Sequence, residues 1–527
     1  MKETIIDFIL LHKWEYSVAF ILSSIAFFIV IQLYPLQYGR DLIDYIRYGE
    51  YLFRDGDTYP VLMIYRPPVS SIYCYSIDRL YSISPLLGYI PVFIAWTICH
   101  ISIFSLSVNI NQWLGYVILL ILFLSVDYLG IFTYICAESL AVAVIPLFAL
   151  FLQKSLNLKG WLHFSIVNGI ICIFLILIRP NFQVFYLIGV YPFIQFLFKK
   201  LSIRSSIKKF FGFIVMTQLL MNAYFLMNFI KFDHYGFWGG ELHIPFYRAY
   251  HSGSIDASNG NKSDELKTLT GKLIEEHKDL KELGITAEDL LAYPDYGGFH
   301  VVVYAAINYL GKIEGSDLLR KCSFESIIKD PLIFWGSYLN DLRYFLEAPT
   351  GSRWDFFNID YKKINTEKLD DLRSKLSLNY EQLGKKIPDS SLIDWKVVDQ
   401  YDWKLLGYSG SAETIINLKR DVLDSNHRLI VERFSSLQIN FFKYLLLIML
   451  SSLFLLKQEL PKYYILALLM FSMFASALVY TPKIWRSIYD PVIIAYSIIL
   501  AYLTVVYIMK KFKVINIYRN NKVSNSE

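Results

Sequence analysis

The sequence predicts an all-α polytopic membrane protein with about ten transmembrane helices and one sizeable soluble segment. Of its 527 residues, 55% are hydrophobic and only 18% are charged, a combination that is rare in a soluble domain of this length. The mean hydropathy is +0.39. The apolar residues also come in blocks of roughly twenty, which is the length that crosses the core of a bilayer.

Taken in order, the apolar blocks divide the chain into four parts. The predicted spans are residues 15–34, 87–108, 114–133, 138–153, 161–179, 183–198, 210–230, 438–456, 463–481 and 489–509. The parts are an N-terminal transmembrane module (1–230) with an outer loop (35–86), a helical soluble segment (231–437), C-terminal transmembrane helices (438–513) and a cytoplasmic tail expected to be disordered (514–527). No small-residue cleavage pattern follows the first block, so we expect it to be a retained span.

Basic residues predict which side of the membrane each loop occupies. They cluster after the fourth, sixth, eighth and tenth predicted spans, at Lys154, Lys159, Lys199, Lys200, Arg204, Lys208, Lys209, Lys457, Lys462, Lys510, Lys511 and Lys513. Because cytoplasmic loops carry an excess of such residues, both termini are predicted to be cytoplasmic. The outer loop and the soluble segment then lie on the outer face of the cell membrane. The net charge of +5 follows from these clusters and does not indicate binding to nucleic acid.

The polar stretch over residues 38–83 concentrates Asp, Arg, Tyr and Pro between two apolar blocks. A helix is predicted over 41–54, on which Asp41 and Asp44 share one face. Its apolar residues repeat at helical spacing and are expected on the membrane interface: Leu42, Tyr45, Ile46, Leu52 and Phe53. Arg66-Pro67-Pro68 then predicts a stiff, extended turn. On pattern alone, a plain solvated helix beside the membrane is the alternative.

The soluble segment shows helical periodicity and no long strand alternation. Ser263 and Thr286 are predicted to cap helices, and Thr286-Ala-Glu-Asp289 has the pattern of a capping box. A stripe of leucines favours core packing over a binding site: Leu266, Leu269, Leu273 and Leu280.

Four ionisable residues stand at the outer ends of apolar blocks. Glu138 begins one predicted span and is expected either to reach water or to line a polar cavity. Arg179 ends another, and Lys483 and Arg486 precede the last. Basic residues on the outer side oppose the usual charge bias, which indicates phosphate binding through forked, charge-assisted hydrogen bonds. Pairing with Asp490 or with lipid headgroups is the alternative.

Short motifs recur in a definite order on the predicted outer side. They are Asp41-Leu-Ile-Asp-Tyr45 with Tyr48-Gly-Glu-Tyr-Leu-Phe53 and Arg66-Pro-Pro-Val-Ser70, then Cys136-Ala-Glu-Ser-Leu140, Ile178-Arg-Pro180 and Trp485-Arg-Ser-Ile-Tyr489-Asp-Pro491. This order resembles the membrane glycosyltransferases of the C-type fold, which include protein O-mannosyltransferases and the aminoarabinose transferase of lipid A. The resemblance covers the membrane regions and does not extend over residues 231–437.

The resemblance implies an inverting glycosyltransferase (a hexosyl or pentosyl transferase) of the cell envelope. Such an enzyme moves a sugar from a polyprenyl-phosphate-linked donor to a glycan, lipid or protein acceptor. The implied roles are a general base for Asp41 with Asp44 as a helper, donor-phosphate binding for Arg179, Lys483, Arg486 and Arg66, and sugar or acceptor binding for Tyr45, Tyr65 and Glu138. No cofactor is required, no phosphate-cradling glycine loop is present, and a divalent metal at Asp41, Asp44 and Glu138 stays open.

Two other classes of protein compete with this interpretation. A polysaccharide polymerase or ligase would place catalytic Arg and His residues in the segment 231–437, where His234, His243 and His251 are expected to be ordinary loop residues. A flippase or transporter of lipid-linked sugars would place charges within spans and break helices near the midplane. The five cysteines have no CxxC or other metal spacing, so a disulfide framework is not predicted. The nine histidines show no HxxxH or HExxH spacing, so a zinc site built on neighbouring ligands is not predicted either.

Overall fold

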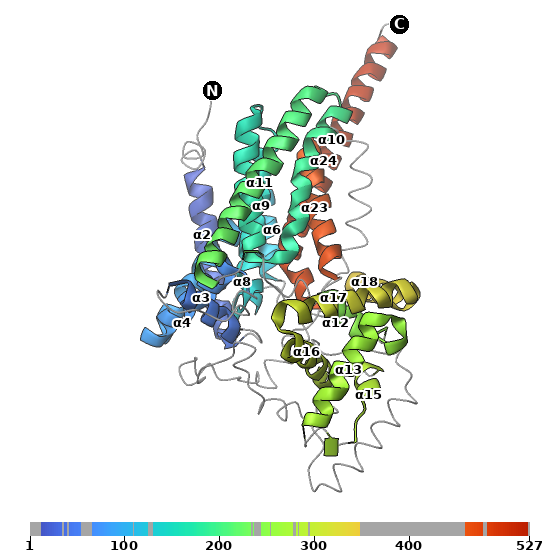
Figure 1. Ribbon diagram of the computed structural model, residues 1–527. Helices are drawn as coiled ribbons and strands as arrows, with labels where there is room; N and C mark the ends of the chain where they lie inside the picture. Colours follow the sequence, from blue (N-terminus) through green and yellow to red (C-terminus); the bar gives the residue numbers. More distant parts are fainter. Residues whose placement is uncertain are drawn as a thin grey trace.

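The chain folds into a bundle of long apolar helices with a smaller helical unit at one end (Figure 1). The computed structural model describes residues 12–33, 36–38, 42–53, 66–108, 110–124, 130–232, 235–236, 244–252, 254–277, 281–282, 284–292, 296–347, 459–477 and 482–524. The bundle elements are α2 (Lys13–Leu33), α5 (Pro85–Val108), α6 (Gln112–Phe123), α8 (Ala137–Ser155), α9 (Trp161–Ile178), the 3-10 helix η3 (Pro180–Val190), α10 (Tyr191–Leu197), α11 (Ile203–Phe232), α23 (Leu460–Ala477) and α24 (Pro482–Ser524).

Six of the described helices are long and apolar enough to cross a membrane. They are α2, α5, α8, α9, α11 and α24. The prediction of a helical membrane protein is thus confirmed in its broad form. The predicted span over 438–456 lies outside the described residues, and the number ten and the sides of the membrane stay predictions.

Three predicted segments differ from the structure. The span expected over 114–133 is a 12-residue helix that ends at Phe123. The span expected over 183–198 is the 3-10 helix η3 followed by α10, with Pro180 and Pro192 near their starts. Proline lacks a backbone donor and favours the first turn, which divides this segment into two helices. The tail expected to be disordered is helical as far as Ser524, and residues 510–524 contain no Gly or Pro that would break the helix.

The outer loop of the sequence prediction contains two helices. The expected amphipathic helix is confirmed as α3 (Leu42–Phe53). A second helix, α4 (Pro68–Ile83), was not predicted, and it ends two residues before α5 begins at Pro85. The stiff turn is confirmed, because Pro67 has φ −68° and ψ 137° and Pro68 is the first residue of α4. Leu42, Tyr45 and Ile46 are buried against this second helix, so they do not lie on the membrane interface as expected.

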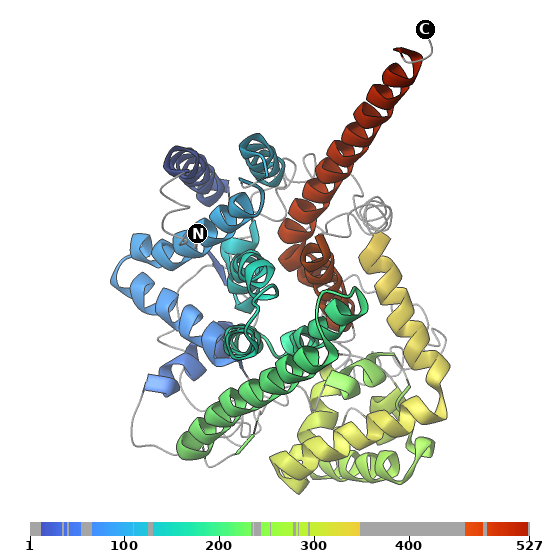
Figure 2. The same cartoon turned by 90° about the horizontal axis from the view of Figure 1, so that it is seen from above.

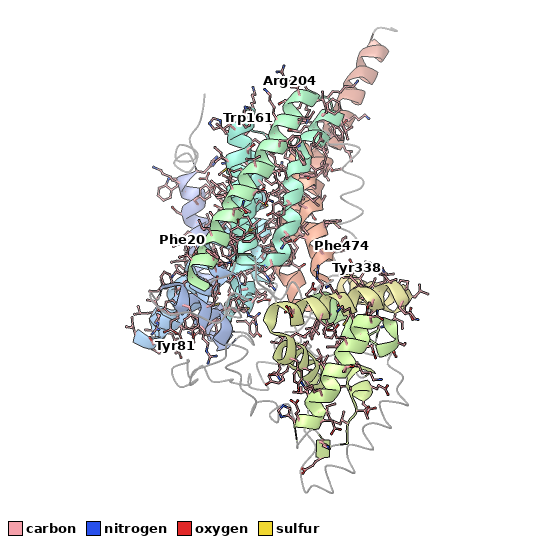
Figure 3. All side chains as sticks on the ribbon, in the orientation of Figure 1. Phe20, Tyr81, Trp161, Arg204, Tyr338 and Phe474 are labelled. Atoms are coloured by element: carbon pink, nitrogen blue, oxygen red, sulfur yellow. The ribbon has the colours of Figure 1, made fainter. Side chains whose placement is uncertain are left out.

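The two ends of the bundle differ in what they carry (Figures 1 and 3). Trp161 and Arg204 mark one end, where α2 begins and α10 turns into α11. Tyr81 marks the other, where α3, α4 and the smaller helical unit lie. The two stretches that the sequence predicts to share one face therefore lie at the same end of the bundle.

The smaller helical unit has a core of its own. It consists of α12 (Ile244–His251), the 3-10 helix η4 (Ala257–Asn259), α13 (Asn261–Glu276), α15 (Ala287–Ala292), α16 (Tyr296–Leu310), α17 (Lys312–Lys329) and α18 (Pro331–Glu347). Leu266 and Leu273 are buried in this core as expected, with Leu269 packed against it. Leu280 lies outside the described residues.

Two predicted caps in this unit had different outcomes. Thr286 and Asp289 form the predicted capping box, because each backbone amide donates to the other side chain, at 3.0 and 3.1 Å. The cap at Ser263 was wrong, since α13 begins two residues earlier, after Gly260. The Glu325 carboxylate instead accepts hydrogen bonds from the amides of Lys262 and Ser263 at the start of α13, at 3.0 and 2.8 Å.

Glu325 makes the start of α13 sensitive to pH. Burial raises the pKa of Glu325, but the hydrogen bonds from Lys262 and Ser263 more than offset this and hold it below its usual value. Because the folded-state pKa is depressed, the stabilisation is present at neutral pH and is lost as the pH falls through that value. We expect Glu325→Gln to weaken protection of these amides against hydrogen exchange by about 1 kcal/mol at neutral pH. The difference between variant and wild type should vanish once acid protonates Glu325, and a difference unchanged by pH would contradict this assignment.

Candidate functional site

A short parallel strand pair brings the start of the first motif next to the start of the second, Cys136–Leu140. Gln37 and Tyr38 (β1) pair with Tyr134 and Ile135 (β2). The first strand precedes α3, and the second leads directly into α8. The segment that leads to Asp41 is thereby hydrogen-bonded to the segment that leads to Glu138.

The start of α4 lies against the end of α9. The hydroxyl of Ser70, on the first turn of α4, donates to the carbonyl of Ile178 at 2.8 Å. The next residue, Arg179, places its Nη1 atom 2.7 Å from Oε1 of Glu138. Three of the motifs therefore meet at this point.

Local structure explains the position of both charged residues. Glu138 lies in the first turn of α8, where the helix dipole favours an acidic side chain. The Ser139 hydroxyl donates to the carbonyl of Cys136, the N-cap residue, at 2.8 Å. Arg179 ends α9 in an extended conformation, and Pro180 starts η3 directly afterwards. Each helix end thus points one charged side chain toward the other.

The Glu138–Arg179 pair is buried, with side-chain exposures of 15% and 8%. The sequence suggested that Glu138 would reach water or line a cavity, whereas its carboxylate contacts a guanidinium. Removing two charges from water is costly unless they compensate each other. The Glu138 carboxylate therefore compensates the charge of Arg179, which lies buried at the end of α9.

The fourth motif reaches the site through α24. The Tyr489 ring packs edge-on against Phe182, with the centroids 6.3 Å apart. The amide of Phe182 donates in turn to the carbonyl of Arg179 at 3.0 Å. Tyr489 and Ser472 of α23 share a buried hydrogen bond of 2.7 Å. The last helices of the chain are thus anchored beside the Glu138–Arg179 pair.

Arg66 also belongs to this region. Its guanidinium lies over the ring of Tyr45, 5.1 Å from the centroid, and the Tyr45 side chain is buried. Burial raises the pKa of the Cys74 thiol on α4, Glu138 raises it further and Arg66 lowers it, so both charges act on one side chain. The sequence assigned Tyr45 to a sugar and Arg66 to a phosphate, whereas the structure places the two in contact.

Gly49 sets how closely α3 approaches α4. A Cβ atom there would lie 2.5 Å from the Ser71 carbonyl oxygen and 2.6 Å from Cβ of Tyr75. We expect Gly49→Ala to destabilise the protein by about 1–3 kcal/mol, because α3 must move off α4. The same shift should separate Tyr45 from Arg66. In Gly271→Ala, the control, the new Cβ would lie 3.8 Å from its nearest neighbour, Cβ of Ala287, so thermal unfolding should show no loss of stability there.

The predicted site residues fall into three groups. Arg66, Tyr45, Glu138 and Arg179 are placed, and they form two contacting pairs, Arg66 with Tyr45 and Glu138 with Arg179. Asp41 and Tyr65 lie outside the described residues. Asp44, Lys483 and Arg486 lie on α3 and α24, but the structure does not describe their side chains. No group of three or more metal-ligating side chains is found among the described residues, so a metal site stays unassigned.

Sequence reasoning missed the face of α4 that touches the site. Its buried residues include Ser70, Ser71, Cys74 and Ile77. Their spacing of three and four residues after Pro67-Pro68 is helical, and it was the available signal. Tyr489 stood in a quoted motif but was given no role.

Comparison with known proteins adds no relative. No protein-family model, curated protein or solved structure matches this chain.

Proposed function

We propose that this protein is an inverting glycosyltransferase that uses a polyprenyl-phosphate-linked sugar. The observation that carries the proposal is the buried Glu138–Arg179 pair, which joins the second and third motifs and has the first and fourth motif segments packed beside it. Residues far apart in sequence converge here around one buried arginine, and a common binding site for the donor phosphate would account for that arrangement. An ionisable side chain inside a membrane bundle is also a functional indicator in its own right; here the pair lies at the bundle end, where a lipid phosphate would lie.

The proposed topology has ten spans, cytoplasmic termini and the site on the outer face of the cell membrane. η3 and α10 together rise about 32 Å, from about 2.0 Å per 3-10 residue and 1.5 Å per α residue, close to the thickness of a bilayer core. These two helices can therefore serve as one span between the site end and the turn before α11. The basic turn at Lys199 and Lys200 lies at the opposite end from α3 and α4, which agrees with a cytoplasmic position.

In the proposed reaction, an acceptor hydroxyl or amine attacks the anomeric carbon of the donor sugar. The carbon–oxygen bond to phosphate breaks, and the lipid phosphate leaves with the electron pair. Asp41 takes the acceptor proton as general base, with Asp44 as a helper. Arg179 stabilises the negative charge that grows on phosphate, assisted by Lys483, Arg486 and Arg66.

The same proposal assigns sugar or acceptor contacts to Tyr45, Tyr65 and Glu138. Glu138 also has a second proposed role, supported by its contact with Arg179. It orients the Arg179 guanidinium and compensates its positive charge before the donor binds. The donor lipid would bind between the helices, and the acceptor would approach from the side of the smaller helical unit. No nucleotide takes part.

The test is a transfer assay with purified protein in nanodiscs and a panel of synthetic polyprenyl-phosphate sugars. We expect release of polyprenyl phosphate from at least one donor in the presence of cell-envelope acceptors. Pyrophosphate-linked oligosaccharides form a second arm, and use of these alone would favour a polymerase or ligase. Movement of the lipid-linked sugar across liposomes without transfer would favour a flippase. Either result would overturn the proposal.

A further inference from the structure

The smaller helical unit gathers its exposed apolar side chains on two neighbouring helices. Within the described residues of 244–347, every exposed large hydrophobic side chain lies on α17 or α18. This α17–α18 strip consists of Phe324, Ile328, Leu332, Ile333, Trp335 and Leu339. Ile328 and Leu332 are 81% and 82% exposed, more than any other large hydrophobic side chain among the described residues. Single exposed apolar residues are ordinary, but a strip confined to one edge indicates a contact.

The strip runs along one face of α18. Leu332, Trp335 and Leu339 follow the three- and four-residue spacing of a helix face. Phe334 points the other way and is buried in the core of the unit. Helix α18 is therefore apolar on two sides, and the unit itself covers only one of them.

The two helices lie across the end of the bundle. In Figure 1 α17 and α18 form the edge of the unit nearest the bundle, with α13, α15 and α16 farther away. In Figure 2 α2 is seen end-on, whereas α17 and α18 are seen along their length. They thus run roughly perpendicular to α2, one of the helices long enough to cross a membrane, as a helix lying in the interface does.

The strip continues the apolar surface of the bundle. The Tyr338 hydroxyl donates to the carbonyl of Phe474, near the end of α23, at 3.2 Å, and Figure 3 shows the two residues together. Phe471, one turn earlier on α23, is 55% exposed. The contact fixes α18 at the depth where an apolar helix of the bundle ends. If α23 crosses the bilayer, that depth would be the boundary between hydrocarbon and headgroups, where tryptophan is enriched.

We propose that the α17–α18 strip inserts into the outer leaflet and anchors the smaller helical unit to the lipid surface. Lipid is the occupant because the strip runs across the direction of α2, and because α18 contacts α23 one turn from the exposed Phe471. Leu332, Trp335 and Leu339 enter the acyl boundary, and Lys329 remains exposed beside Ile328, where it can reach the headgroups. The smaller helical unit is then held against the membrane surface beside the end of the bundle and does not move as a free domain.

The test measures depth in the full chain reconstituted in phosphatidylcholine–phosphatidylglycerol nanodiscs. Nitroxide labels are attached in Leu332→Cys and Leu339→Cys, with Glu288→Cys on α15 as the control on the same unit. The native cysteines are buried free thiols, and the unsubstituted chain gives their background labelling. We expect the ratio of oxygen collisions to nickel-chelate collisions to be several-fold higher at 332 and 339 than at 288.

Two results would overturn the anchor. Equal nickel access at 332, 339 and 288 would place the strip in water. Labels protected from both reagents in nanodiscs and in detergent would place the strip under protein, either another part of this chain or a second copy. All three substituted side chains are exposed, so thermal unfolding of each variant should match that of the unsubstituted chain.

Discussion

Arg179→Met will lower both stability and transfer activity, and we expect it to be among the most damaging single changes in the protein. Methionine preserves most of the volume but leaves the Glu138 carboxylate buried without its cation. Breaking a buried pair in this way costs about 3–5 kcal/mol. Loss of a charged donor for the leaving phosphate should lower kcat by a further ~10²–10³-fold in protein that remains folded.

A double variant separates the two effects. In Glu138→Gln/Arg179→Met neither charge remains, so most of the lost stability should return, while transfer stays low. The matched control is Arg79→Met, which breaks the Glu50–Arg79 pair at 3.2 Å, where Arg79 is 53% exposed. An exposed pair of that kind contributes about 0–1 kcal/mol.

Unfolding in mixed micelles and single-turnover transfer provide the two measurements. If the double variant regained stability together with full activity, the pair would be purely structural and the phosphate role of Arg179 would be lost. If Arg179→Met were no less stable than Arg79→Met, the pair would not be buried in the working protein.

The sequence predicted the elements that rest on local chemistry. The helix at 42–53, the turn at Pro67-Pro68 and the capping box at Thr286 each depend on a few adjacent residues. Burial was predicted where apolar residues repeat at helical spacing, as for Leu266 and Leu273. The broad class of apolar helical membrane protein followed from composition alone.

Features that depend on tertiary contacts were not predictable in the same way. Helix α4 was missed because its small polar residues, such as Ser70 and Ser71, resemble a loop in sequence, and only the folded chain places Ser70 against α9 and Ser71 against α3. The interfacial position expected for Tyr45 was wrong because Arg66 and α4 cover it. The Glu138–Arg179 pair joins residues from two helices, and each sequence position gave only a charged residue at the end of an apolar block.

Asp41→Asn is the second large effect, and it tests the proposed chemistry most directly. We expect a loss of about 10²–10⁴-fold in kcat, the range that general base catalysis contributes. Asp41 immediately precedes Leu42, where α3 begins, so its sequence position is also one at which a residue can cap a helix.

Asparagine caps helices about as well as aspartate but cannot accept a proton, so this substitution distinguishes the two roles. If Asp41 only started the helix, Asp41→Asn would retain activity and stability, whereas Asp41→Ala would lower both. If Asp41 is the base, both variants are inactive, and only the alanine variant is less stable. Asp44→Asn serves as the neighbouring control, with a smaller loss expected for a helper. Transfer at the wild-type rate by Asp41→Asn would remove the base from the proposed mechanism, even if the polyprenyl-phosphate donor were confirmed.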